Sequence, residues 1–470
     1  MIKFGTDGWR AYIADEFTFK NVEILAQAIA DFLNSKNKNK ERPRILIGYD
    51  TRFLSAEFAS SAARVLCANN IKTYLTKKPT PTQVISFSVV NRHFDGGIII
   101  TASHNPPQFN GMKFRTYFGG SADDFTTKEI EAKLYKSKVK STSLELAQRK
   151  KLFNYIDDLD DKYIKFLNKY VNVKKIKNSN LKILIDPMFG AGIGYLYNIL
   201  KGGKIELGAT RSSLNPSFGG VNPEPIEKNL LSSMKIVKKE KFDICIATDG
   251  DADRVGIIDE KGNYVTTQQV FMLLLVHLVE DKLMRGDLAR TVSATNILDR
   301  IARKFNLKVH ETSVGFKYIA SLIRTKDIVM GGEESGGYSF KNYIPERDGI
   351  LAGLLLLEMM VERKEKISKI LNSIEKEYGR SRYLRKDVHF PAHLKGKFLS
   401  KIKKNPPSKL AGERIKKIQT FDGIHFILED DSWLLLRFSG TEPILRIYAE
   451  TNRLSKTQKL MKAGLRLAFA

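Results

Sequence analysis

The chain has 470 residues. Since folded domains average roughly 150 residues, this length predicts about three domains and excludes a single small module. Lysine and arginine number 78 against 52 aspartates and glutamates, which gives a formal net charge of +26. Hydrophobic residues make up 42% of the chain, enough for several buried cores, so wholesale disorder is excluded.

Neither the cysteines nor the apolar segments indicate export or membrane insertion. Cys67 and Cys245 lie far apart on mostly apolar stretches. They give no support to a disulfide framework or a cysteine metal site, which favours a reducing compartment. The N-terminus lacks an apolar signal core, and the most apolar window, 350–361, is shorter than the ~20 residues that cross a bilayer. We therefore expect a cytoplasmic protein with no membrane partner.

Helical and strand-like patterns alternate through the first third of the chain. In order, we expect a helix over 17–33, a strand over 44–49, a helix over 57–70, a strand over 71–75, a helix over 82–90 and a strand over 97–100. The tripeptide Asp50-Thr51-Arg52 comes directly after the first of these strands. This alternation predicts a parallel or mixed sheet covered by helices.

The same rhythm restarts twice and then changes. After a basic stretch that we interpret as a linker, over 136–151, we expect strands over 181–186, 242–247 and 291–294, a helix over 349–363, and strands over 421–428, 433–437 and 444–449. The predicted fold class is α/β, with three related mixed-sheet α/β domains followed by a smaller α+β C-terminal domain, around a central cleft. We expect the domains to cover residues 1–152, 153–257, 258–372 and 373–470.

A polar loop, Thr101 to Pro106, follows the strand that ends at Ile100. In open α/β sheets, ligands bind beyond the carboxyl ends of strands, which makes this loop a favoured place for chemistry. Ser103 is a candidate nucleophile if a base or a metal-held electrophile assists it. His104 is the next residue and cannot be assumed to face it, and a plain turn without chemistry is the alternative.

Three carboxylates alternate in a second loop, at Asp249, Asp251 and Asp253, between two expected strands. In an extended loop this spacing lets the carboxylates converge on one hard cation, Mg²⁺ or Ca²⁺. An EF-hand is excluded, because Arg254 stands where the sharp turn of that motif needs glycine and the flanks are strands. The alternative is a solvated acidic turn, in which the carboxylates would repel one another.

Two further motifs lie in the second half of the chain. In Gly332 to Gly337, Glu333 and Ser335 have the chemistry to hydrogen-bond sugar hydroxyls, but the segment taken alone is a weak signal and a plain turn is the favoured interpretation. The last motif lies between two expected strands and has an arginine fork, two hydroxyls and a glycine amide suited to a phosphate: Arg437, Ser439, Gly440 and Thr441. A simple hairpin turn is its alternative.

In this order along an α/β chain, the four motifs resemble the α-D-phosphohexomutase family, and the chain is most similar to bacterial or archaeal phosphoglucomutase/phosphomannomutase. The resemblance covers nearly the whole chain, beginning at the segment Phe4 to Arg10. It implies that Ser103 is carried as phosphoserine and donates its phosphoryl group to a hexose monophosphate. The resulting bisphosphate turns over in the site, and its other phosphate returns to Ser103.

The resemblance also implies a role for each candidate residue. The catalytic set is Ser103, Lys113, Arg10 and His104; the ligands of one Mg²⁺ per chain are Asp249, Asp251, Asp253 and Ser103; the substrate-binding set is Arg254, Glu333, Ser335, Lys317 and Arg347; and the distal phosphate is held by Arg437, Ser439, Gly440 and Thr441. Lys113 would act as general acid or base only if neighbouring charge depressed its pKa.

The individual residues of the segment Gly332 to Gly337, called the sugar loop below, bear on the identity of the substrate. Phosphoglucosamine mutases tend to carry Glu-Gln-Ser-Gly-His there, and dual phosphomanno/phosphoglucomutases Glu-Met-Ser-Gly-His, whereas this chain has Glu-Glu-Ser-Gly-Gly over 333–337. The missing histidine shifts an acid or base role toward Lys113 or Arg347. The loop looks more like that of the phosphoglucomutases that carry Glu-Glu-Ser. We therefore expect glucose 1-phosphate and glucose 6-phosphate to be interconverted, with glucose 1,6-bisphosphate as activator. Phosphomannomutase and phosphoglucosamine mutase activities are the alternatives, in a monomer or a dimer.

Two other classes of protein compete with this interpretation. The net charge of +26 would suit a nucleic-acid-binding protein. The lysines, however, are spread over linkers and helix faces without a stacking aromatic motif, so no nucleic acid is expected. A metal-dependent phosphatase would use a similar serine and cation but release phosphate to water.

Overall fold

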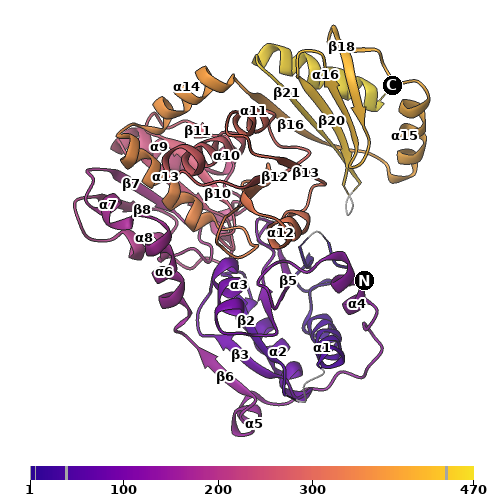
Figure 1. The fold of residues 1–470 in the computed structure, drawn as a ribbon. Helices are drawn as coiled ribbons and strands as arrows, with labels where there is room; N and C mark the ends of the chain where they lie inside the picture. Colours follow the sequence, from indigo (N-terminus) through magenta and orange to yellow (C-terminus); the bar gives the residue numbers. More distant parts are fainter. Residues whose placement is uncertain (1, 6, 38–40, 440–442, 470) are drawn as a thin grey trace.

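The chain folds into three α/β units with mixed sheets, followed by a unit with an antiparallel sheet, as the sequence predicts (Figure 1). The computed structural model describes residues 2–5, 7–37, 41–439 and 443–469. Figure 1 shows the first unit and the last at opposite ends of the molecule, with the second and third between them. Segments far apart in the sequence are therefore brought together where the first three units meet.

The first sheet has the strand order β1-β5-β4-β2-β3-β6, and β2, β3, β4 and β6 run parallel. Its strands are β1 (Trp9–Tyr12), β2 (Arg44–Tyr49), β3 (Lys72–Thr76), β4 (Gly96–Ile100), β5 (Phe109–Thr116) and β6 (Phe153–Ile156). The helices are α1 (Phe19–Lys36), α2 (Ser55–Ala68), α3 (Thr82–Asn91), α4 (Asp124–Glu131) and α5 (Leu144–Arg149). Because β6 pairs with β3, the first sheet extends past residue 152.

The second sheet has the order β11-β10-β9-β7-β8. Its strands are β7 (Lys182–Asp186), β8 (Glu206–Ala209), β9 (Ile244–Thr248), β10 (Val255–Asp259) and β11 (Tyr264–Val265). Helical segments of this part are α6 (Leu159–Tyr170), α7 (Val173–Lys177), α8 (Tyr195–Leu200), η1 (Phe218–Gly220), η2 (Glu227–Asn229) and α9 (Leu231–Glu240). The antiparallel pair of β9 and β10 leaves the loop with three aspartates at one end of the sheet.

The third sheet has the order β13-β12-β14-β15. Its strands are β12 (Asp287–Thr291), β13 (Val309–Thr312), β14 (Ile328–Gly332) and β15 (Tyr338–Phe340). The helical segments are α10 (Thr267–Val276), η3 (His277–Asp281), α11 (Ile297–Lys304), α12 (Phe316–Thr325), α13 (Gly349–Arg363) and α14 (Ile367–Tyr378). The strand expected over 291–294 is wrong by four residues, because the chain turns after β12, where the amide of Ala294 donates to the carbonyl of Thr291.

The fourth sheet is antiparallel, in the order β16-β21-β20-β19-β18-β17. Its strands are β16 (Arg382–His389), β17 (Lys409–Leu410), β18 (Glu413–Gln419), β19 (Ile424–Leu428), β20 (Trp433–Phe438) and β21 (Ile444–Thr451). The helical segments are η4 (Ala392–Leu394), α15 (Lys395–Lys404) and α16 (Leu454–Phe469). The predicted α+β character of this part is confirmed.

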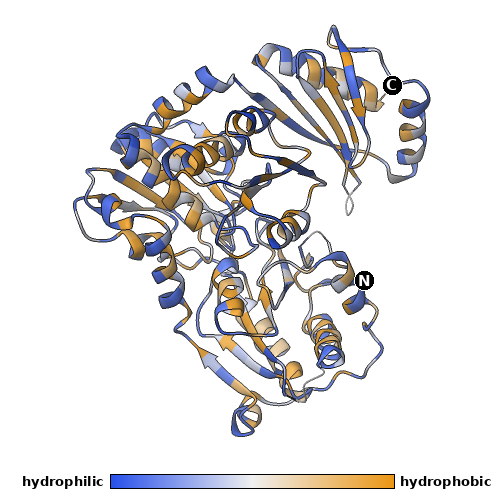
Figure 2. Cartoon of the chain, viewed as in Figure 1, coloured by the Kyte–Doolittle hydropathy of each residue, from blue (hydrophilic) through white to orange (hydrophobic). Residues whose placement is uncertain are grey.

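The hydrophobic cores divide the molecule unequally. One large cluster joins residues of the first three units, including Leu46, Ile185 and Leu288, whereas the fourth unit has a cluster of its own around Leu434 and Ile447. Figure 2 shows hydrophobic residues along the strands and on the buried helix α13. The first unit also has a second cluster of its own, around Leu25 and Ile47, so the first three units are joined by a shared cluster in which the fourth unit takes no part.

The structure also bears on the expectations about the cysteines and about membrane-spanning helices. Cys67 and Cys245 are both free and buried. Over the part of the chain that the structure describes, no helix has the length and apolar character needed to span a bilayer.

Candidate active site

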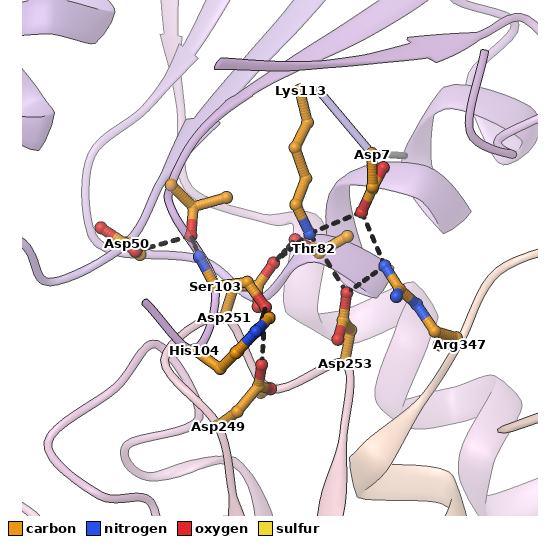
Figure 3. A network of polar contacts seen from close by, with 12 residues as sticks. Asp7, Asp50, Thr82, Ser103, His104, Lys113, Asp249, Asp251, Asp253 and Arg347 are labelled. Carbon is orange, nitrogen blue, oxygen red and sulfur yellow. Dashed lines mark hydrogen bonds and ion pairs between the residues drawn. The ribbon is translucent and has the colours of Figure 1, made fainter. Parts of the chain in front are cut away.

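The serine loop, Thr101 to Pro106, follows β4 and leads to β5, and it places Ser103 in a buried position. Ser103 is 1% exposed and its backbone has φ 53°, in the left-handed region that residues with a side chain seldom adopt. Its hydroxyl donates to Oδ2 of Asp249 across 2.8 Å (Figure 3). The first and second motifs of the sequence are therefore in direct contact.

The aspartate loop between β9 and β10 is fully buried. The carboxylates of Asp249, Asp251 and Asp253 offer oxygens that all lie within 4.8 Å of one another. Gly250 sets how closely the two loops approach, because a Cβ at this position would lie 2.4 Å from the carbonyl oxygen of Ser103. Burial, together with the charges of Asp251 and Asp253, raises the pKa of Asp249 well above its ordinary value.

The aspartate loop fits a divalent cation. Oδ1 of Asp251 and Oδ1 of Asp253 are buried and have no hydrogen-bond partner. An unpartnered carboxylate oxygen is costly to bury unless a cation or a donor reaches it. An all-oxygen ligand set is the one that Mg²⁺ prefers. The alternative of a solvated turn is therefore excluded, since these carboxylates are withdrawn from solvent.

Lys113, on β5, is held by carboxylates of two units. Its Nζ lies 2.6 Å from Asp251, 3.1 Å from Asp253 and 2.9 Å from Asp7. Burial alone would lower the pKa of Lys113, but these three carboxylates outweigh it and raise the pKa above its ordinary value. The depression of this pKa that a general acid or base role would require is therefore not found.

Arg347 joins the first three units. Its Nη2 lies 2.6 Å from Asp7 and 2.6 Å from Asp253, and its Nη1 lies 3.7 Å from Glu333. The side chain passes over Gly337, where a Cβ would lie only 2.3 Å from its Cδ. A histidine at position 337 would need the space that Arg347 fills, which gives a physical reason for the glycine in this sugar loop.

The third unit contributes three more predicted residues, of which two lie together. Oε1 of Glu333 accepts a hydrogen bond from the amide of Gly315 at 3.1 Å, and burial raises the pKa of Glu333. The hydroxyl of Ser335 is buried and has no hydrogen-bond partner. Lys317, in contrast, forms an ion pair with Asp124 of the first unit.

Arg10, Arg254 and His104 lie around the serine loop. Nη1 of Arg10 donates to Oδ1 of Asn105 at 2.7 Å, and the backbone amide of Arg254 donates to Oδ1 of Asp249 at 3.0 Å. Nδ1 of His104 is 3.4 Å from the hydroxyl oxygen of Ser103. Burial and then nearby cations, led by Arg254, hold the pKa of His104 well below its usual value, so the imidazole is neutral and a weak base.

The fourth unit presents Arg437 at the end of β20. Its Nε lies 3.0 and 2.9 Å from the two carboxylate oxygens of Asp422, and Oδ2 of Asp422 also accepts from the amide of Val314 at 2.7 Å. Ser439 donates its amide to the carbonyl of Ile444. The predicted Gly440 and Thr441 lie outside the described residues.

Several residues of the site were not predicted as such. Asp7 lies within the segment Phe4 to Arg10, where the family resemblance begins, and was given no role, yet it binds Lys113, Arg347 and Arg115, the last at 2.7 Å. The hydroxyl of Thr82 donates to Oδ2 of Asp251 at 2.6 Å. Lys113 and Arg115 lie two apart on one strand, and this spacing places both on the same face, which is a signal that could have drawn attention to Arg115.

The chain matches four successive domain descriptions of one family. They are phosphoglucomutase/phosphomannomutase alpha/beta/alpha domain I over 1–140, domain II over 161–262, domain III over 266–378 and the C-terminal domain over 399–463. These matches cover most of the described structure, in the order in which the four sheets follow one another.

Whole-length relatives agree with these matches. The chain is 31% identical to a phosphoglucomutase/phosphomannomutase of Thermococcus kodakarensis, over 99% of this chain and 98% of the relative. It is 29% identical to a phosphoglucosamine mutase of Methanococcus maripaludis, over 100% and 99%. A crystal structure of a proposed phosphomannomutase from Thermus thermophilus is similar with a TM-score of 0.88 and 32% identity, covering 100% of this chain and 99% of that one.

Proposed function

The chain belongs to the phosphoglucomutase/phosphomannomutase family of phosphohexomutases, and from this premise we propose that it interconverts glucose 1-phosphate and glucose 6-phosphate through a phosphoserine at Ser103. One observation carries the proposal: the buried hydroxyl of Ser103 lies 2.8 Å from an aspartate of a triad suited to a divalent cation. The four ranges 1–152, 153–257, 258–372 and 373–470 are our proposed division of the chain, although β6 beyond the first bound pairs in the first sheet and β11 beyond the second bound pairs in the second sheet.

The phosphoryl group moves between Ser103 and the sugar. In the first transfer a bond forms from phosphorus to a hydroxyl oxygen of the hexose monophosphate, which gives up its proton, while the bond between phosphorus and Oγ of Ser103 breaks and Oγ takes up a proton. The bisphosphate turns round. In the second transfer Oγ of Ser103 loses its proton and binds the other phosphorus, whose bond to the sugar oxygen breaks as that oxygen is protonated. Glucose 1,6-bisphosphate is the proposed activator, since it can phosphorylate an unmodified Ser103.

Charge neutralisation governs such a transfer, and the site is rich in fixed charge. Asp249, Asp251 and Asp253, with a phosphoryl oxygen on Ser103, would hold one Mg²⁺, which when bound supplies positive charge against the phosphoryl oxygens. The protein's own cations here are Lys113, Arg10, Arg254 and Arg347. Because the pKa values of Lys113 and Arg347 are raised by neighbouring carboxylates despite burial, we assign both side chains to charge stabilisation rather than to proton abstraction.

Substrate recognition falls to the third and fourth units. Glu333 and Ser335 are proposed to bind sugar hydroxyls, and the buried Ser335 hydroxyl is free to take a ligand as its partner. Arg437 and Ser439, with Gly440 and Thr441, are proposed to hold the phosphate that is not reacting. Lys317 would reach a substrate only by leaving Asp124.

The identity of the sugar has a second candidate. A relative named phosphoglucosamine mutase is 29% identical over the full length of this chain, which favours glucosamine phosphates as an alternative substrate. Mannose phosphates are a third candidate, since the relative from Thermococcus kodakarensis is named for glucose and mannose phosphates. The doubled glutamate at 333 and 334 and the glycine at 337 lead us to place glucose phosphates first.

We further propose a cytoplasmic monomer or dimer that binds no nucleic acid. The two buried, free cysteines suit a reducing compartment. The excess of lysine and arginine is spread over the chain, and the substrate is itself an anion.

A coupled assay with glucose 1-phosphate, mannose 1-phosphate and glucosamine 1-phosphate, with Mg²⁺ and a trace of the matching bisphosphate, tests this function. Ser103→Ala should abolish turnover of every sugar. Ser233→Ala is the matched control, because Ser233 is also a buried serine that donates to an aspartate, Asp186, but lies on α9. Near-normal turnover by Ser103→Ala would exclude the phosphoserine, and phosphate release rivalling isomerisation would favour a phosphatase.

A further inference from the structure

Arg52 lies next to the serine loop, and its whole guanidinium is used in hydrogen bonds. Its side chain is fully buried, and its Nε donates to Oδ2 of Asp50 at 3.0 Å. The other four N–H groups of the guanidinium donate to four backbone carbonyls within or next to the serine loop, at 2.7 to 2.9 Å: those of Ser103, Asn105, Pro106 and Phe109. All five donors of this guanidinium are therefore used.

Asp50 reaches Ser103 by a second route. Its Oδ2 accepts the hydroxyl proton of Thr101 at 2.6 Å, and the oxygen of that hydroxyl accepts from the backbone amide of Ser103 at 2.8 Å. Since the hydroxyl of Thr101 donates to Asp50, its lone pairs point toward the amide of Ser103. Figure 3 shows Asp50 on the side of Ser103 away from Asp249.

Both peptide groups of Ser103 are thus held by one ion pair. The carbonyl is bound by Arg52 directly, and the amide is bound by Asp50 through Thr101. The left-handed backbone of Ser103 needs such support, because this conformation is unfavourable for a residue with a side chain. In addition, the guanidinium lies over the ring of Phe218 from the second unit, 5.0 Å from its centroid.

We propose that the pair of Asp50 and Arg52 is a positioning element for phosphoryl transfer: it fixes the backbone of Ser103 so that the hydroxyl points at the aspartate loop. Neither residue touches the substrate in this scheme. The inference rests on the proposed role of Ser103 as phosphoryl carrier. A misplacement of about 1 Å at a reacting centre can cost roughly 10²-fold in rate, so this support should be visible in kcat.

The experiment compares three variants by kcat, KM, thermal unfolding and the fraction of chains phosphorylated by the bisphosphate, read by intact mass. Thr101→Val keeps the shape of the side chain and removes the hydroxyl, so kcat and the rate of phosphorylation should fall roughly 10²-fold, with KM within about 3-fold. Thr101→Ser keeps the hydroxyl and should restore both rates. Arg52→Lys keeps the charge but loses the fork, and should resemble Thr101→Val.

Arg211→Lys is the matched control. Arg211 also pairs with a buried aspartate at the end of a parallel strand, Asp186 of β7, but its fork reaches the carbonyl of Asn229 and not the serine loop. This control should lower the unfolding temperature and leave kcat unchanged, which separates positioning from stability. A folded Thr101→Val enzyme with wild-type kcat overturns the inference, whatever Arg52→Lys does. If Ser103→Ala itself stays active, the proposed function fails instead.

Discussion

The two ends of the proposed site are built differently. At the phosphoryl-transfer end, Ser103, the three aspartates, Lys113 and Arg347 are buried and bound to one another across three units that share one hydrophobic core. At the phosphate-recognition end, Arg437 pairs with Asp422 of its own unit, which has a separate core. The comparison teaches that the proposed chemistry, at the fixed end, lies among units joined by one apolar cluster, whereas the proposed phosphate recognition lies in a unit with its own cluster, which suits that unit to move as a whole.

The contact between these two parts is partly apolar and partly polar. Val292 of the third unit packs with Trp433, Leu435 and Tyr448 of the fourth, and hydrogen bonds and an ion pair accompany this cluster. Among them, Arg385 lies 3.1 Å from Glu334, so the sugar loop is also a docking point for the fourth unit. A change at the fixed end should therefore act on kcat, and a change at the other end on KM.

The largest expected effect is that of Asp251→Asn at the fixed end. Its carboxylate binds Lys113 and leaves one bare oxygen for a cation, so we expect kcat to fall by ~10² to 10³ and the Mg²⁺ requirement to rise sharply. Asp243→Asn, in the same unit, removes an aspartate that pairs with Lys366 outside the site and should leave the Mg²⁺ titration unchanged. An unchanged requirement in Asp251→Asn would argue against the metal loop.

At the recognition end we expect Arg437→Ala to raise KM for the sugar phosphate about 10-fold to 100-fold, since a hydrogen bond to a charged group contributes about 1.5 to 3 kcal/mol. The value of kcat should stay within a few-fold. Arg437→Lys keeps the charge without the planar fork of donors, so its KM should lie between those of the wild type and Arg437→Ala. Steady-state kinetics would contradict the comparison if Arg437→Ala lowered kcat and left KM unchanged.

Gly337→Ala is expected to have a smaller effect, of roughly 10-fold on kcat, because the new Cβ would push Arg347 away from Asp7 and Asp253. Gly396→Ala on α15 is the control, since nothing lies within 4 Å of its added Cβ. Equal rates for the two variants would show that the position of Arg347 is not critical.

The last expected effect concerns stability, not rate, at the contact between the two parts. Burial raises the pKa of Glu450 to about 7, although the hydroxyl of Thr295 donates to this carboxylate at 2.9 Å. A raised carboxyl pKa means that the folded protein keeps the proton while the unfolded chain loses it. Stability is therefore lost as pH rises from about 4.5 to 7, by about 3 kcal/mol for one such group.

Glu450→Gln removes this titration. Relative to wild type, the variant should gain stability between about pH 5 and pH 8 in thermal unfolding scans. The exposed Glu429→Gln is the control and should follow wild type at every pH. Parallel curves for Glu450→Gln and wild type would show that Glu450 is ionised in the folded protein.

Sequence patterns predicted individual strands and helices, and the family resemblance predicted which motifs meet. Neither predicted the buried ion pairs around Lys113. The strand over 44–49 and the helix over 349–363 have the bounds expected from their apolar runs. Ser103 and the aspartate loop were expected to meet because the family resemblance makes Ser103 a ligand of the same Mg²⁺, and the two loops are in contact. The direction of the pKa shift of Lys113 could not be predicted, since it depends on Asp7 and Asp251, which lie far from it along the chain and reach Nζ only through folding.

The separate core of the last unit has a consequence for protein engineering. Since that unit encloses its own hydrophobic cluster, it could be exchanged for the corresponding part of a relative as one block, at the short segment between α14 and β16. Such a chimaera would bind the sugar phosphate through the phosphate-binding residues of the relative, while Ser103 and the three aspartates stayed those of the parent.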